Sequence, residues 1–157
     1  NTHLEAFSEG NTKRDQIDVF HSVLSDLSSD NKVWVGGGDL NSLPKGSEIL
    51  TGFPDDCPGR FEPDDYSGEE EWLDPLFDDF NSAMSLEDYE QNNSNWFSYT
   101  GNPDEGWTRT LDYVFTNGQW AEDGANNMVI QSEENGGYDT IMVSDHAPVQ
   151  AILEVNQ

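Results

Sequence analysis

Two stretches of the chain space their apolar residues as an amphipathic helix does. Within residues 12–28 an apolar side chain recurs every three or four positions, at Ile17, Phe20, Val23, Leu24 and Leu27. This spacing places them on one helical face, and the same spacing predicts a second helix over 72–86. The segment 44–71 between them is dense in Pro, Gly and Asp, which predicts a long ordered loop.

The remaining apolar positions form short runs typical of strands. Val33 to Val35 is an apolar run that ends at three glycines, which we interpret as a short buried strand. In the last third of the chain, runs rich in β-branched and aromatic residues predict strands at 95–99, 111–116, 127–131 and 149–155. A helix, a strand, a second helix and several late strands indicate an α/β or α+β class.

Composition narrows the possible functions. The 157 residues contain 32 Asp and Glu against 6 Lys and Arg, a net charge of −26. This charge excludes a basic nucleic-acid-coating protein, argues against adsorption on anionic lipid, and suggests a halophilic or marine source. Cys57 is the only cysteine, which excludes an intramolecular disulfide and a zinc site built on several thiolates. No apolar run approaches the length of a membrane span.

Four short signatures carry the candidate chemistry, all at expected strand ends or turns. They are Asn1-Thr2-His3, Gly38-Asp39-Leu40-Asn41, Leu111-Asp112-Tyr113-Val114-Phe115 and Ser144-Asp145-His146-Ala147-Pro148. The first Asp–Asn pair combines a proton acceptor with an amide donor on one side of a strand end. The Asp–His pair of the last signature places a hard oxygen ligand beside a base with a pKa near 6.5. Each signature alone also fits an ordinary surface or core position.

As an ordered set, the four signatures resemble the endonuclease/exonuclease/phosphatase superfamily, the metal-dependent phosphoesterases related to pancreatic deoxyribonuclease. The resemblance implies a four-layer α/β sandwich that hydrolyses phosphoester bonds with Mg²⁺, or with Mn²⁺ or Ca²⁺ in its place. It covers nearly the whole chain but only part of the family domain. Residues 1–157 are therefore expected to be the carboxyl-terminal portion of a single domain whose amino-terminal portion is missing.

The resemblance also implies roles for individual residues. Asp39 matches the aspartate that activates the attacking water, and Asn41 matches the asparagine that binds the scissile phosphate. His146 matches the histidine that contacts the phosphate, with Asp112 holding its imidazole. His3 matches a histidine that assists at the phosphate in the nuclease, sphingomyelinase and 5-phosphatase branches.

Three further residues complete the expected site. Asp145 is expected to support the metal, and Thr108 and Arg109 are expected to contact the substrate. The principal metal-binding glutamate of the family lies upstream of the first signature. The chain is therefore expected to be a fragment, inactive by itself, with an exposed sheet edge and an exposed apolar face.

The negative charge favours a small or lipid-linked phosphoester over long nucleic acid as the substrate, since few Lys or Arg are present to replace counterions. We expect a monomer. The compartment stays open, with an extracellular or periplasmic location favoured. The rival hypothesis is a non-catalytic acidic module of the same fold that binds Ca²⁺ or a partner protein through its acid-rich loops.

Overall fold

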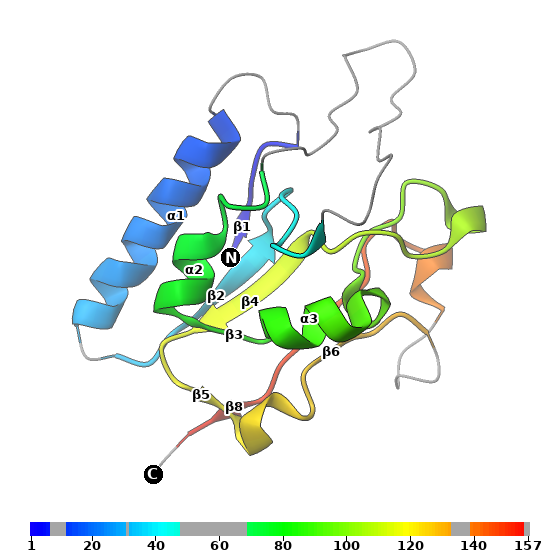
Figure 1. Cartoon of the computed structure of the whole chain (residues 1–157). Coiled ribbons are helices and arrows are strands. Elements are labelled where there is room, and N and C mark those ends of the chain that lie inside the picture. Colours follow the sequence, from blue (N-terminus) through cyan, green and yellow to red (C-terminus); the bar gives the residue numbers. More distant parts are fainter. Residues whose placement is uncertain (7–11, 31, 48–68, 133–138, 156–157) are drawn as a thin grey trace.

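A four-stranded mixed sheet lies at the centre of the molecule (Figure 1). The computed structural model describes residues 1–6, 12–30, 32–47, 69–132 and 139–155. The strand order is β1 (Thr2–His3), β2 (Val35–Asp39), β4 (Asp112–Thr116) and β3 (Asn81–Ser82). β1 runs parallel to β2, whereas β4 is antiparallel to both of its neighbours. The molecule is therefore a mixed α/β protein.

Helices α1 (Thr12–Ser29) and α2 (Asp74–Asp79) pack side by side on one face of this sheet (Figure 1). Phe77 of α2 meets the rings of Tyr113 and Phe115 edge to face, with ring centres 6.1 and 5.4 Å apart. Alternate residues of β4 point to opposite faces, so Asp112 points away from these helices. The helices therefore cover one face and leave Asp112 on the other.

The structure confirms the helix expected over 12–28 and the strand expected over 111–116. It corrects the strand expected at Val33 to Val35: β2 begins at Val35 and includes the three glycines, while Val33 and Val35 are more than half exposed. A Cβ on Gly37 would lie 2.1 Å from the Tyr113 carbonyl oxygen, and a Cβ on Gly38 would lie 1.9 Å from the Thr2 oxygen. The glycines therefore allow the neighbouring strands to approach, and they do not terminate β2.

The prediction of a single helix over 72–86 is wrong. α2 ends at Asp79, Phe80 adopts an extended conformation, and Asn81 pairs with Thr116 as the first residue of β3. A separate helix, α3 (Leu86–Asn92), then begins behind Ser85, whose hydroxyl accepts a hydrogen bond from the Asp88 amide. The helical spacing of apolar residues continues through Phe80 and Met84, although the pairing of β3 with β4 interrupts the helix there.

The other predicted strands are shorter than expected. The run at 95–99 instead forms the end of a 3₁₀ helix (Asn93–Trp96), followed by isolated bridges at Tyr99. The run at 127–131 keeps only β6 (Met128–Val129). The run at 149–155 splits into β7 (Val149–Gln150) and β8 (Leu153–Glu154), because β7 pairs with β6 while β8 pairs with β5 (Gln119–Trp120). Different pairing partners prevent one continuous strand.

Three further 3₁₀ turns connect these elements, at Pro103–Glu105, Ala121–Gly124 and Thr140–Met142. Of the loop expected over 44–71, residues 48–68 lie outside the described residues, as does Cys57. Within the described ranges, no helix is both long and apolar enough to cross a membrane.

An apolar stripe on α1 faces solvent. Val19, Val23 and Leu27 are 64%, 49% and 38% exposed, and they line a groove beside β1 together with Val35. Among the described strands, β1 pairs only with β2, so its other edge is open. Both the edge and the apolar face are therefore exposed in the described chain.

Candidate functional site

Strand pairing brings three of the predicted residues into one row. His3 is paired with Asp39 across β1 and β2, and Asp39 is paired with Asp112 across β2 and β4. Residues directly opposite each other in a sheet project from the same face with adjacent Cβ atoms. The row lies where β2 ends and β4 begins, at the carboxyl end of the parallel pair formed by β1 and β2.

His146 completes this group from the turn that precedes β7. Its Nδ1 lies 2.7 Å from Asp112 Oδ2, and its Nε2 lies 3.7 Å from Asp39 Oδ2. His3 Nε2 lies 3.4 Å from the same oxygen of Asp39. Asp39 Oδ2 therefore faces two imidazole nitrogens, and Asp112 holds one of the two imidazoles from its other side.

Asn41 is placed by a tight turn directly after β2. Its φ of 48° is in the left-handed region that Asn tolerates better than most residues. The Asn41 backbone N–H donates to Asp39 Oδ1 at 2.9 Å, and its side-chain amide donates to the Leu4 carbonyl and, at 3.2 Å, to Asp39 Oδ2. In this state Asn41 orients the Asp39 carboxylate.

The site raises the pKa of both Asp39 and His146. Burial is the main cause for Asp39, and the nearby Asp112 charge adds to it, while the Asn41 amide and the two imidazoles oppose the rise. For His146 the main cause is the hydrogen bond to Asp112, supported by the surrounding carboxylates and opposed by burial. Asp39 becomes a stronger base, and His146 keeps its proton to higher pH.

The same residues are the structure's candidate metal ligands. One ligand atom from each of Asp39, Asp112 and His146 lies within 4.8 Å of the others, the only such group found among the described residues. Asp112 Oδ2 already accepts hydrogen bonds from His146 and Ser98, however. Asp145 lies outside this group, and its side chain is exposed while its carbonyl accepts from the Thr100 amide. The structure therefore does not bring the Asp145 carboxylate, the predicted metal support, into this group.

Thr108 and Arg109, the predicted substrate-binding residues, are separated from His146 by Tyr99. Tyr99 forms β-bridges with His146 and with Arg109, and so stands between them. Arg109 is buried and its guanidinium donates to the Thr108 carbonyl at 2.6 Å, while the Thr108 amide donates to the Tyr99 carbonyl. The structure thus places both residues near the site but behind Tyr99.

Ser98 and Tyr99 are site residues that the sequence reasoning missed. The Ser98 hydroxyl donates to Asp112 Oδ2 at 2.7 Å, and the Tyr99 ring centre lies 5.1 Å from that of His146. Both belong to the run interpreted as a strand because of its aromatic content. A small polar residue between Phe97 and Tyr99 was the available signal, since a buried hydroxyl needs a partner.

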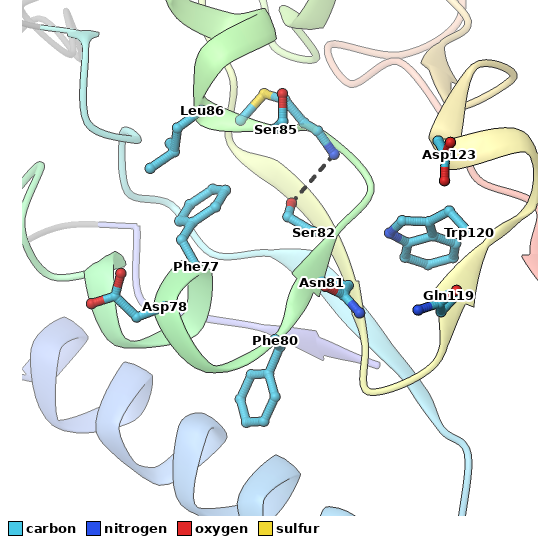
Figure 2. Close-up of a pocket in the computed structure, with 11 residues that line it drawn as sticks. Phe77, Asp78, Phe80, Asn81, Ser82, Ser85, Leu86, Gln119, Trp120 and Asp123 are labelled. Carbon is cyan, nitrogen blue, oxygen red and sulfur yellow. Dashed lines mark hydrogen bonds between the residues drawn. The ribbon is translucent and has the colours of Figure 1, made fainter.

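Two further hollows lie beside the central sheet. One, of about 450 Å³, lies between α2, β3 and β5, and Figure 2 shows Trp120, Ser82 and Asn81 around it. The Trp120 indole nitrogen is closed off from the surface, and among the described residues it has no hydrogen-bond partner. The other hollow, of about 480 Å³, borders Asp112 and His146 and is the one next to the candidate chemistry.

The chain matches no protein-family model, no curated protein and no solved structure in comparisons with known proteins.

Proposed function

We propose that this protein is a divalent-metal-dependent phosphoester hydrolase. The observation that carries the proposal is the chain of contacts from Asp112 through His146 to Asp39. It combines a basic carboxylate with an imidazole whose proton is retained by a second carboxylate. A general base can activate water, and a protonated imidazole can stabilise the charge on a phosphoryl group, so the two components side by side support this reaction.

In the proposed reaction Asp39 accepts a proton from a water molecule, whose oxygen attacks phosphorus in line with the ester oxygen. The P–O bond to the leaving group breaks, and the leaving oxygen is protonated from solvent. His146 donates Nε2–H to a phosphate oxygen and stabilises the charge that develops in the transition state. The 3.4 and 3.7 Å separations around Asp39 Oδ2 are longer than direct hydrogen bonds, which leaves these groups available to water and phosphate.

Asn41 and His3 are proposed to hold the phosphate beside these residues. The 3.2 Å hydrogen bond from the Asn41 amide to Asp39 is the one that a phosphate oxygen would replace. His3 offers its Nε2 from the exposed side, since its side chain is 74% exposed.

The oxygen donors of this group, the carboxylates of Asp39 and Asp112, fit a weakly held Mg²⁺. This ion commonly takes one or two carboxylates together with substrate phosphate oxygens and waters. Asp145 would supply a further carboxylate. When bound, the cation neutralises phosphate charge. Because few protein ligands are offered, we expect Mg²⁺, Mn²⁺ or Ca²⁺ to bind weakly before substrate arrives.

A small or lipid-linked phosphoester is the proposed substrate class. The hollow beside Asp112 and His146 has a volume of about 480 Å³, in the range of small-molecule sites, and its lining includes Val114, Pro148 and Val149. Such apolar walls suit an aromatic or aliphatic ester group. The net charge of −26 opposes the approach of a long polyanion.

We also infer the fold of the superfamily, a four-layer sandwich in which the β1–β2–β4–β3 sheet belongs to one of two packed sheets. In support, β7 lies beside β4, and the turn before β7 reaches Asp112 on the face away from α1 and α2. The exposed α1 stripe and the open β1 edge support a fold larger than the described sheet.

The test is hydrolysis by the full-length product of the gene. Bis(p-nitrophenyl) phosphate and p-nitrophenyl phosphate are assayed with Mg²⁺, Mn²⁺ or Ca²⁺, at low and high salt. His146→Ala is compared with His21→Ala, because His21 makes a 2.7 Å contact with Asp79 away from the site. We expect metal-dependent release of nitrophenol that His146→Ala removes and His21→Ala retains.

Release of nitrophenol that is indifferent to His146→Ala would reject the site. A complete lack of turnover, with Ca²⁺ bound equally by the wild type and His146→Ala, would favour the non-catalytic acidic module instead.

A further inference from the structure

Ser98 is a wholly buried serine whose hydroxyl is saturated with hydrogen bonds. Its Oγ donates to Asp112 Oδ2 at 2.7 Å and accepts from the backbone N–H groups of Leu111 and Asp112 at 3.1 and 3.0 Å. One hydroxyl therefore binds both the side chain and the backbone of Asp112. The position of this carboxylate relative to the start of β4 is fixed by these three contacts.

The backbone of Ser98 also connects the two segments that carry the Asp112–His146 pair. Its N–H donates to the Arg109 carbonyl at 2.6 Å, in the segment that leads into β4. Its carbonyl accepts from the Ala147 N–H at 2.7 Å, directly after His146. The Ser98 backbone therefore binds both the segment that carries Asp112 and the segment that carries His146.

We propose that Ser98 is a positioning residue for the Asp112–His146 pair. The terminal torsion of an Asp side chain has a broad energy profile, so packing alone does not fix the plane of the carboxylate. Asp112 Oδ2 accepts from Ser98 Oγ and His146 Nδ1, and these two donors together define that plane. With the plane fixed, the imidazole holds its Nε2 toward Asp39.

Tyr99 supports the same arrangement from the next position. Its ring lies 5.1 Å from the His146 ring at an angle of 56°, and its backbone bridges the His146 backbone. The Ser98–Tyr99 segment therefore restrains the carboxylate through a hydrogen bond and the imidazole through ring packing.

The effect of Ser98 on turnover rests on the proposed function, but its effect on the pair does not. The first measurement therefore uses no substrate. At one fixed pH, the Nδ1 proton that His146 shares with Asp112 is expected as a low-field proton NMR signal, assigned by its absence in His146→Ala. We expect Ser98→Ala to lose or broaden this signal and Ser98→Thr, which keeps the hydroxyl, to retain it.

Thr116→Ala is the matched control. Thr116 is another wholly buried hydroxyl on β4, which donates to the Trp34 carbonyl and accepts from the Gly118 N–H at the opposite end of the strand. We expect it to lower thermal stability as Ser98→Ala does but to keep the low-field signal. If Ser98→Ala does not fold, Ser98→Cys replaces it, because a thiol fills a similar space but is a poor donor.

The second measurement is steady-state hydrolysis. We expect Ser98→Ala to lower kcat about ten- to a hundredfold with little change in KM, as loss of a supporting contact does, and Ser98→Thr to restore kcat. An unchanged low-field signal in Ser98→Ala or Ser98→Cys would overturn the proposal, and so would loss of the signal in Thr116→Ala. Loss of the signal in a protein that hydrolyses nothing would leave Ser98 as the positioning residue and reject the hydrolase alone.

Discussion

Two His–Asp pairs in this protein have the same contact distance and different surroundings. His146 and Asp112 approach to 2.7 Å, and so do His21 and Asp79. The Asp79 side chain is 58% exposed, whereas the Asp112 side chain is 20% exposed. A short His–Asp contact alone therefore does not distinguish the two pairs.

The difference lies in what stands beyond each imidazole. His21 on α1 reaches Asp79 on α2, and its ring lies 5.4 Å from that of Phe80, so the pair joins two helices. The imidazole of His146 instead lies between two carboxylates, with Asp112 at one nitrogen and Asp39 at the other. Strand register sets that second arrangement, because Asp39 and Asp112 are directly paired.

Replacing Asp39, the second carboxylate beside His146, should therefore cause the largest loss of kcat. We expect Asp39→Asn to lower kcat about 10³- to 10⁴-fold, because the proposed water-activating base is lost while its shape is kept. Because burial penalises the charged form of Asp39, the neutral amide should not lower the melting temperature. Hydrolysis of bis(p-nitrophenyl) phosphate and a thermal melt check both expectations. Full activity in Asp39→Asn would remove the distinction between the two pairs.

The next largest loss of kcat should come from Asp112, and the matched change at Asp79 provides the comparison. We expect Asp112→Asn to lower kcat about 10²- to 10³-fold, since an amide no longer holds the imidazole with its proton on Nδ1. Asp79→Asn makes the same chemical change in the other pair and should leave kcat within about twofold, because exposed ion pairs contribute little. Parallel kinetics of the two variants measure the contrast. Equal losses would show a general effect on folding instead.

The elements of this site were predictable from sequence, but their assembly was not. Asp39 and Asp112 each stand at the edge of an apolar run, and that pattern placed both at strand ends. Their direct pairing depends on the register of two strands more than 70 positions apart, which local periodicity does not encode. The close approach of these strands requires Gly37, a residue that the sequence analysis interpreted as the end of β2.

Ser98 and α3 show the same limit in different ways. Ser98 lies in an aromatic run that resembles a strand, and its hydroxyl acquires a role only through Asp112, 14 positions away. The break before α3 followed from the pairing of Asn81 with Thr116, and neither this break nor the Ser85 cap that starts α3 was predicted from the sequence. The helix over 12–28 was predictable from the local spacing of its apolar residues, whereas the contacts set by sheet pairing were not.

A pH titration sharpens the comparison further. Asp112 raises the pKa of His146 above its usual value of 6.5, so the midpoint of its imidazole NMR signal should lie above 6.5. The stabilising effect of the His146–Asp112 pair on the folded protein is fully present below pH 6.5 and is lost as pH rises through the raised pKa.

The rate of hydrolysis should decline over that same alkaline range, and it should decline in acid as Asp39, whose pKa is also raised, becomes protonated. With three histidines in the chain, single His→Ala variants assign each signal. A His146 midpoint at or below 6.5 would contradict this account.

The smallest effect concerns the stability supplied by the pair on the helices. His21→Ala should cost about 0–1 kcal/mol in free energy of unfolding, because Asp79 is more than half exposed and its interaction is screened by solvent. Salt should reduce this cost, since ions screen exposed charges over about 10 Å at 0.1 M. Urea unfolding at low and high salt measures it, with Asp79→Asn as the matched variant. A cost of several kcal/mol that resists salt would show that the helix pair is as constrained as the pair at the sheet, and the contrast between them would then rest on Asp39 alone.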